Sequence, residues 1–359
     1  MTRIATWFPD EVSTFDVPAL TFQQAKEVNP DFAWNMALWR PRGGLGDMLM
    51  LTPTFKTIKE NFPNCKLTLI TSFKYLDGAL RELLWDNPYL DRVIDKSELD
   101  NNSDPQNKFH IIGNMDCPCR EHEEPKRFPP NRVDLFVNSI GLKHKGVPKL
   151  FYKVKDEEKR WAADFLKKKR SGKRNPLIMY QPFASSEKRS PEVAQSKHIL
   201  AAIAAEYPNC GILVPTHHSD WAPDSDFNLL NCEHLKDYPV RRLGALIEVC
   251  DVIVAPDSSL LHLAIALDKP LVSIFGPTVP ESRVNYHGRG VALNLGKHYC
   301  KGGHPCWFAK CNFGRICWKN LQESDVVKAI GMALRGEYHK FDTRLPDPPP
   351  STRIRAEEL

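Results

Sequence analysis

Hydrophobic runs alternate with amphipathic stretches along most of the chain, and this alternation predicts strands that are followed by helices. In the first half, apolar runs predict strands at 34–39, 66–71, 92–94 and 109–112, and 3.6-residue periods predict helices at 48–61, 76–84, 132–140 and 156–169. A repeated strand–helix–strand order is typical of a parallel sheet that is covered by helices on both faces. We therefore expect a doubly wound α/β domain.

The same rhythm restarts after a polar stretch at 171–175, where we expect a domain boundary. The second half predicts strands at 177–181, 211–214, 251–255 and 270–275, and helices at 197–207, 240–249, 260–267 and 323–334. The predicted organisation is an irregular N-terminal extension (1–33), a first Rossmann-like domain (34–174), a second one (175–335) with a cysteine-rich insert (299–318), and a proline-rich tail (336–359).

The composition is that of a globular protein with a mild positive charge. The 359 residues are 42% hydrophobic and 26% charged, with a formal net charge of +5. This charge suits anionic ligands such as sugar nucleotides but does not indicate a dedicated nucleic-acid binder. The basic run at 167–174 is either a solvated helix end with a linker or a contact to an anionic membrane or polymer. No stretch reaches the roughly 20 apolar residues of a membrane span, and the first residues lack the order of a signal peptide, so we expect a cytoplasmic protein.

A glycine-rich loop precedes the first predicted helix. Gly43, Gly44 and Gly46 would let the backbone approach a ligand closely. Asp47, at the entry to the helix, would either cap it or act chemically on a bound group. The spacing matches neither a phosphate-binding loop with a Gly-Lys-Ser/Thr ending nor a dinucleotide loop.

Two polar segments in the second half could bind an anion. Asp257, Ser258 and Ser259 open a predicted helix, so they either cap it or offer hydroxyls beside free backbone N–H groups, which is a good phosphate site. His262 on the same helix is either a structural residue or a ligand contact. Ser185 and Ser186, with Lys188 and Arg189 behind them, could neutralise a diphosphate.

Taken together, these segments resemble glycosyltransferase family 9, the ADP-heptose:lipopolysaccharide heptosyltransferases and their relatives. The resemblance covers about residues 35–335. The matching segments are GLGD at 44–47 with LTP at 51–53, NPYLDRVI at 87–94, SSEK at 185–188, DSSLLHLA at 257–264 and PLVSIFGPT at 270–278. The resemblance implies a GT-B fold, in which two Rossmann-like domains face each other across a cleft. It also implies an inverting, metal-independent transfer of a sugar from a nucleotide diphosphate to a hydroxyl.

Carried over residue by residue, the resemblance makes Asp47 the general base, which takes the proton of the acceptor hydroxyl. Lys188 becomes the phosphate-binding lysine, and the donor-binding set is Ser185, Ser186, Lys188, Asp257, Ser258, Ser259, Leu260 and His262. The resemblance favours an ADP-sugar donor carrying a heptose or another hexose-like sugar. It implies no catalytic divalent metal. The acceptor is left open between a glycan, a protein and another polymer, with contact to a membrane surface as a further expectation.

Two other function classes compete with this interpretation. One is a GT-B sugar-nucleotide epimerase, which needs no acceptor, and the other is a non-catalytic module that binds a sugar nucleotide or nucleic acid. The presence of both Asp47 and Lys188 favours an enzyme. Release of nucleoside diphosphate only when an acceptor is present would distinguish a transferase from an epimerase.

Four cysteines cluster near the end of the second half. Cys300, Cys306, Cys311 and Cys317 are separated by five, four and five residues. In a reducing compartment such a cluster indicates a structural zinc or iron before disulfides, although disulfides and free thiols remain alternatives. The family resemblance adds that some protein-modifying relatives carry a four-cysteine iron site.

Overall fold

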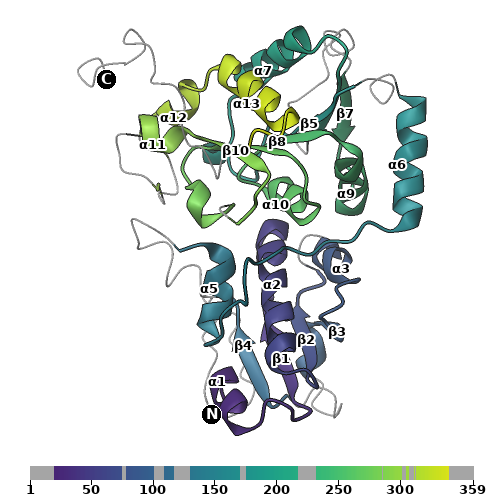
Figure 1. Cartoon of the computed structure of the whole chain (residues 1–359), viewed down its shortest axis with the longest axis vertical. Helices are drawn as coiled ribbons and strands as arrows, with labels where there is room; N and C mark the ends of the chain where they lie inside the picture. The colour runs from purple at the N-terminus through teal and green to yellow at the C-terminus, as the bar shows by residue number, and fades with distance from the viewer. Residues whose placement is uncertain are drawn as a thin grey trace. The chain divides into compact units, whose positions relative to one another are not determined.

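The chain divides into two compact units, residues 1–153 and 154–359. The computed structural model describes residues 20–74, 78–100, 109–116, 130–169, 175–216, 232–284, 286–300, 305–306, 311 and 313–338 (Figure 1). The division falls before the polar stretch at 171–175, because helix α6 (Asp156–Lys168) packs within the second unit. There Arg241 Nε lies 2.7 Å from Glu158 Oε1, and Arg241 is on helix α9 (Val240–Val249).

The first unit contains a parallel sheet with the strand order β3-β2-β1-β4. Its strands are β1 (Asn35–Trp39), β2 (Lys66–Thr71), β3 (Arg92–Asp95) and β4 (Ile111–Asn114), and its helices are α1 (Phe22–Val28), α2 (Leu45–Asn61), α3 (Ala79–Leu84) and α5 (Arg132–Ser139). Buried apolar side chains from several strands, among them Ala37, Trp39, Ile70 and Ile94, form part of the core with Phe109. The sequence predicted all four strands to within two residues.

Helix α1 corrects the expectation that residues 1–33 are irregular. Thr21 caps this helix, and its hydroxyl accepts a hydrogen bond from the Gln24 N–H. Phe22 and Ala25 are buried, and the Phe22 ring lies against Gly113 of β4, where an added Cβ would come within 3.1 Å of it. The helix has only seven residues and two buried positions, which is too short a pattern to stand out from the sequence.

The second unit has the strand order β10-β9-β8-β5-β6-β7, and all neighbours are parallel. Its strands are β5 (Leu177–Tyr180), β6 (Gly211–Thr216), β7 (Cys232–Lys236), β8 (Val252–Pro256), β9 (Leu271–Phe275) and β10 (Gly290–Asn294). Its further helices are α7 (Val193–Glu206), α10 (Ser259–Ala266), α11 (Leu295–Tyr299), α12 (Ile316–Lys319) and α13 (Glu323–Leu334). Counted within the unit, this is the 3-2-1-4-5-6 order of a Rossmann sheet.

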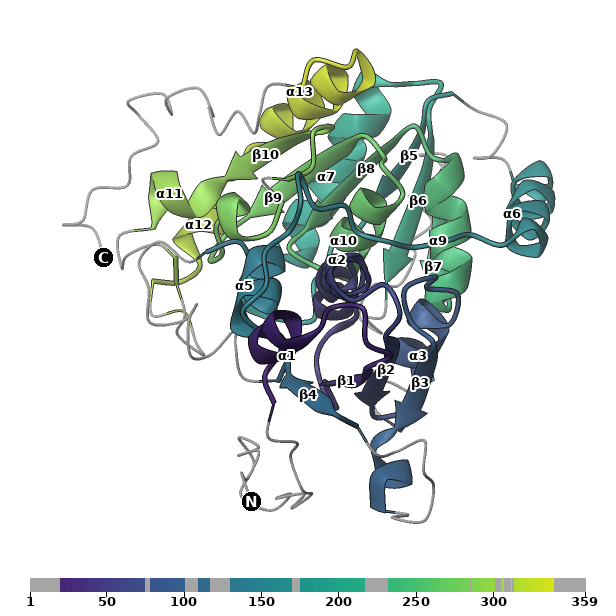
Figure 2. The ribbon, with the colours of Figure 1, turned by 60° about the horizontal axis from the view of Figure 1, so that its bottom comes forward.

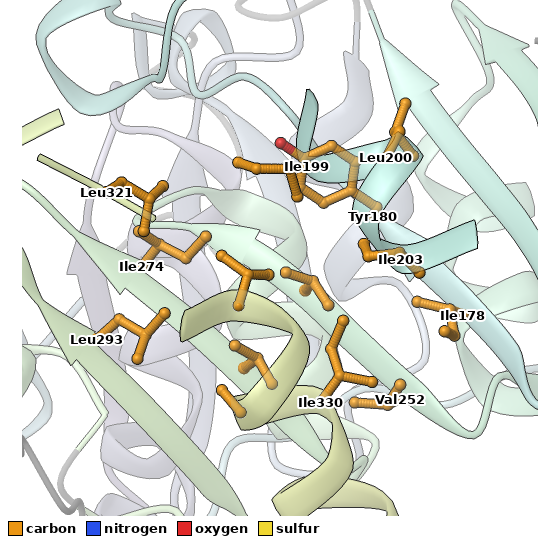
Figure 3. Packing of buried hydrophobic residues seen from close by; sticks show 14 of the residues in the cluster. Ile178, Tyr180, Ile199, Leu200, Ile203, Val252, Ile274, Leu293, Leu321 and Ile330 are labelled. Carbon is orange, nitrogen blue, oxygen red and sulfur yellow. The ribbon is translucent and has the colours of Figure 1, made fainter. Parts of the chain in front are cut away.

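The core of the second unit lies between its sheet and helices α7 and α13. Ile178, Val252 and Ile274 of the strands pack with Ile203 of α7 and Ile330 of α13 (Figure 3). Helix α13 packs on the part of the sheet that β8, β9 and β10 form (Figure 2). Strands buried on both faces are continuous apolar runs rather than alternating ones, and β8 and β9 are buried at every position. This core holds β5 and β8 side by side, which positions the loops that follow them.

None of the helices in the described ranges combines the length and the apolar character that crossing a bilayer requires. All but the first three residues of the predicted proline-rich tail, and the end of the basic run at 170–174, lie outside the described residues.

Candidate functional site

The second unit has its topological switch point between β5 and β8, which are hydrogen-bonded neighbours although the chain leaves them toward opposite edges of the sheet. Ligands of open α/β sheets bind at such a point, beyond the carboxyl ends of the strands. Two segments emerge there: residues 181–192, named here the β5–α7 loop, and the turn that joins β8 to α10 at Asp257 and Ser258 (Figure 1). Both segments contain residues that the sequence singled out.

Asp257 is a buried carboxylate surrounded by hydrogen-bond donors and cations. Its Oδ2 accepts a hydrogen bond of 2.8 Å from Thr278 Oγ1 and lies 3.6 Å from Arg283 Nε and 3.7 Å from Arg189 Nη1. His262 Nε2 lies 3.9 Å from its other oxygen. The side chain of Asp257 is 6% exposed and that of Arg283 is 4% exposed, so this pair is removed from water, whereas Arg189 is 27% exposed.

The surroundings of Asp257 keep its carboxyl group ionised. Burial alone would raise its pKa, but Arg283, the hydrogen bond with His262 and Arg189 outweigh burial and hold the pKa well below its usual range. Asp257 therefore holds the two arginines in place as a fixed negative charge. Of these three side chains, Arg189 is the most exposed and the one that an anionic ligand could reach.

Helix α10 begins directly after this carboxylate. Ser258 is the extended residue before the first turn, and its hydroxyl donates to Gln181 Oε1 rather than capping the helix. The backbone N–H groups of the first turn have no intrahelical acceptor and carry the positive end of the helix dipole. Leu260 and His262 point into the protein interior, 5% and 2% exposed. The assignment of Ser259, Leu260 and His262 to donor binding stays a prediction.

The β5–α7 loop places a second set of polar groups near the turn. Arg189 Nη1 donates to the Asp257 carbonyl at 2.9 Å, and Arg189 Nη2 donates to Ser185 Oγ at 2.8 Å. Ser190 Oγ donates to the Ser186 carbonyl and accepts from the Ala184 N–H, which closes the loop on itself. Arg189 thereby joins Ser185 to the turn before α10, and Lys188 precedes Arg189 in the same short 3₁₀ turn, Glu187–Arg189.

In the first unit, Asp47 lies in the first turn of α2, three residues after the cap residue Gly44. Its carboxylate accepts from the Gly44 N–H at 3.3 Å, so the capping role expected of it is real. It also binds two cations: Arg132 Nη1 donates to Oδ1, and Arg40 Nη2 lies 3.4 Å from Oδ2. The Asp47 side chain is 21% exposed, so a small group can still reach it. Gly46 is buried in the helix.

The two arginines beside Asp47 were missed in the sequence, although Arg40 directly precedes the glycine-rich loop. Arg40 is 4% exposed, donates to the Met115 carbonyl and stacks on the Phe136 ring at 5.1 Å. Gly43 has a φ of +138°, and an added Cβ there would come within 2.8 Å of the Arg40 guanidinium. Gly43 is therefore needed for both its conformation and its lack of a side chain. Arg132 comes from α5, far along the chain, and nothing local in the sequence pairs it with Asp47.

The described cysteines are all free thiols. Burial raises the pKa of the Cys317 thiol to about 12, and the nearby thiols of Cys300 and Cys311 add to this rise. In the described parts of the chain, no three His, Cys, Asp or Glu side chains are arranged to hold a metal ion. The donor set for the expected zinc or iron is therefore not assembled there, and the assignment of Cys300, Cys306, Cys311 and Cys317 stays a prediction.

The segment around Asp257 and α10 is similar to known proteins. A family model described as glycosyltransferase family 9 (heptosyltransferase) matches residues 237–304, which include Asp257 and α10. Lipopolysaccharide heptosyltransferase 2 of Salmonella typhimurium is 40% identical over 60 residues, which are 16% of this chain and 17% of the relative. The match thus spans less than a fifth of that relative's length.

Two solved structures share the fold over most of the chain. A family 9 glycosyl transferase from Veillonella parvula has a TM-score of 0.62 and 16% identity, covering 86% of this chain and 99% of that one. The ADP-heptose lps heptosyltransferase II of E. coli has a TM-score of 0.59 and 15% identity, covering 84% and 99%. Identities this low show the fold alone.

Two Rossmann-like units with these neighbours define the GT-B type of glycosyltransferase fold, as the sequence predicted. Within that fold class, residues 237–304 of the chain are similar to glycosyltransferase family 9 (heptosyltransferase), and a 60-residue segment is similar to lipopolysaccharide heptosyltransferase 2. These matches are to glycosyltransferases and give no support to an epimerase or to a nucleic-acid binding module.

Proposed function

We propose that this protein transfers a heptose or a related sugar from an ADP-sugar to a hydroxyl group of an acceptor, with inversion at the anomeric carbon. The observation that carries the proposal is the start of α10, where Asp257 holds Arg189 and Arg283 within 3.7 Å of its carboxylate. This cationic turn lies inside the segment that matches the glycosyltransferase family model.

The diphosphate of the donor would bind at this turn. The first-turn N–H groups of α10 and Ser259 offer hydrogen bonds and the positive end of a helix dipole. Lys188 and Arg189 of the β5–α7 loop add positive charge, which stabilises the diphosphate as it departs. Ser185 and Ser258 act indirectly, because Ser185 accepts from Arg189 and Ser258 donates to Gln181.

Asp47 is proposed as the general base. The acceptor oxygen attacks the anomeric carbon, the bond from that carbon to the diphosphate oxygen breaks, and the acceptor proton passes to the Asp47 carboxylate. Arg40 and Arg132 hold this carboxylate in one direction, and a carboxylate is a weak base. A weak base suffices when the hydroxyl becomes acidic as the new bond forms, so proton transfer accompanies the attack.

The acceptor class proposed is a lipopolysaccharide-type glycan, because the relatives matched in sequence are named as lipopolysaccharide heptosyltransferases. A protein acceptor is the competing outcome. A contact with a membrane surface would fit a lipid-linked glycan. The proposed compartment is the cytoplasm, where the free thiols of the described cysteines would stay reduced. No catalytic divalent metal is expected.

The proposal is tested first on the donor. Binding stabilises a folded protein by mass action, so thermal unfolding is measured with ADP-, UDP-, GDP- and TDP-sugars at equal concentration. ADP-heptose should raise the midpoint most. If none of the four raises it, the nucleotide-sugar assignment is wrong, and if another nucleotide leads, the adenine assignment is wrong.

A further inference from the structure

Three backbone carbonyls of the β5–α7 loop are occupied by two side chains from residues 313–321, named here the α12 segment. Trp318 Nε1 donates to the Lys188 carbonyl at 2.7 Å. Arg315 Nη1 donates to the Glu187 carbonyl at 3.0 Å and to the Ser190 carbonyl at 3.5 Å. The α12 segment is about 130 residues away in sequence and belongs to the cysteine-rich region, to which no role in the donor site has been given.

Trp318 is held rigidly in place. Its side chain is 1% exposed, and the indole packs on Gly276 directly after β9. A Cβ added at Gly276 would come within 2.5 Å of Trp318 Nε1, so only glycine leaves room for the ring. On the other side, Gln195 Nε2 of α7 donates to the Trp318 carbonyl at 2.7 Å and to the Leu321 carbonyl at 3.1 Å.

Arg315 makes the second connection between the α12 segment and the β5–α7 loop, and it does so from an unusual backbone conformation. Its φ of +55° lies in the left-handed region, which few residues other than glycine adopt. Its Nη2 donates to Glu192 Oε1 at 3.0 Å, and its own N–H donates to Cys311 Sγ at 3.3 Å. The guanidinium therefore spans both ends of the turn that contains Lys188 and Arg189.

The three bonded groups are backbone carbonyls, which must face away from the ligand in a loop that binds an anion. A carbonyl oxygen carries partial negative charge and repels a phosphate, whereas N–H groups and cationic side chains attract it. Bonds to Trp318 and Arg315 fix the carbonyls of Glu187, Lys188 and Ser190 in one direction. They also fix the backbone from which Lys188 and Arg189 extend.

We infer that Trp318 and Arg315 are positioning residues for the diphosphate of the donor, acting through the β5–α7 loop and without contacting the ligand. The inference rests on the proposed function, since it requires a diphosphate at the start of α10. It gives the cysteine-rich region a role in donor binding: the α12 segment, which contains Cys317 and bonds to Cys311 through the Arg315 N–H, determines the position of Lys188.

The test uses the full chain, purified without chelator, and two variants. Trp318→Phe keeps an aromatic ring in the core but removes the indole N–H, and Arg315→Gln leaves the core untouched. A hydrogen bond of this kind contributes a net 0.5–1.5 kcal/mol, so ADP should bind each variant about 3- to 10-fold more weakly by calorimetric titration. Adenosine, which has no phosphate, should bind as it does to the wild type.

Matched controls come from the same unit. Trp161→Phe alters a half-buried tryptophan of α6, and Arg335→Gln alters an exposed arginine that pairs with Glu337. Both should leave ADP affinity unchanged. In steady-state assays Trp318→Phe and Arg315→Gln should raise the donor KM and also lower kcat, because Lys188 stabilises the diphosphate as it departs. Arg315→Lys should recover part of the loss.

A double variant separates positioning from a general effect on stability. Once Lys188→Ala has removed the ammonium group, Trp318→Phe should weaken ADP binding by a smaller factor than it does in the wild type. An equal factor in both backgrounds, or wild-type ADP affinity in both Trp318→Phe and Arg315→Gln, overturns the inference. If the wild type binds neither ADP nor another nucleoside diphosphate, the proposed function itself fails.

Discussion

Replacing Asp257 by Asn should destabilise the second unit far more than an ordinary loss of one surface charge. The Asp257 carboxylate compensates Arg283, whose side chain is only 4% exposed, and it also accepts from Thr278 at 2.8 Å. Asparagine keeps the shape but removes the charge, so the Arg283 guanidinium stays buried without this partner. Breaking a buried ion pair from one side costs about 3–5 kcal/mol.

A matched control lies at the other end of α10. Asp268 pairs with Arg289 at 3.4 Å, but its side chain is 74% exposed, and solvent screens such pairs to about 0–1 kcal/mol. Free energies of unfolding would be measured for the wild type, Asp257→Asn and Asp268→Asn by urea denaturation at pH 7. If Asp257→Asn loses no more than Asp268→Asn does, the carboxylate is not the charge that holds this turn together.

The pH dependence gives an independent check on the same residue. The pKa of Asp257 is lower in the folded protein than in the unfolded chain, where it is about 3.9. Its stabilisation is therefore complete above the unfolded value and is lost as the pH falls toward the folded value. The advantage of the wild type over Asp257→Asn should be constant from about pH 7 to 5 and shrink below about pH 4. A constant difference down to pH 3 would show that the charge does not cause it.

Other expectations follow from the proposed site. Asp47→Asn should lower the transfer rate by about 10²–10⁴-fold with little change in ADP affinity; a folded variant with near-normal turnover would leave Asp47 as a helix cap only. Lys188→Ala should weaken ADP-heptose and ADP together in calorimetry and leave adenosine unchanged, and equal ADP affinity would remove Lys188 from the site. Elemental analysis of protein purified without chelator should find about one zinc or iron per chain if the cysteines bind metal, and finding none would reject that prediction. Transfer should persist in EDTA, because no catalytic divalent ion is expected, and complete loss of transfer would contradict this.

The strands of both sheets were the easiest elements to predict, since buried parallel strands such as β8 and β9 are uninterrupted apolar runs. Strand β7 was missed because its sequence, Cys-Glu-His-Leu-Lys, is that of a half-buried edge strand. Strand β10 was missed although it is buried, since Gly290 and Asn294 at its ends are typical turn residues.

The chemical site could be predicted only where it is local in the sequence. Asp47, Lys188 and Asp257 each lie in a short motif that follows a predicted strand, and this position marks them. Their partners come from distant elements: Arg132 from α5, Arg283 from the turn after β9, and Trp318 from α12. These contacts depend on which strands become neighbours in the sheet. The hydrophobic periodicity of a single segment does not specify the strand order.

Acceptor-dependent release of ADP would distinguish sugar transfer from an ADP-sugar from any other use of that donor. Purified protein would be incubated with ADP-heptose, with and without a lipopolysaccharide core acceptor, and ADP and product would be quantified together. ADP should appear in equal amount to a glycosylated product of inverted anomeric configuration, and only when the acceptor is present. Release of ADP at the same rate without the acceptor, or a product of retained configuration, would contradict the proposed inverting transfer.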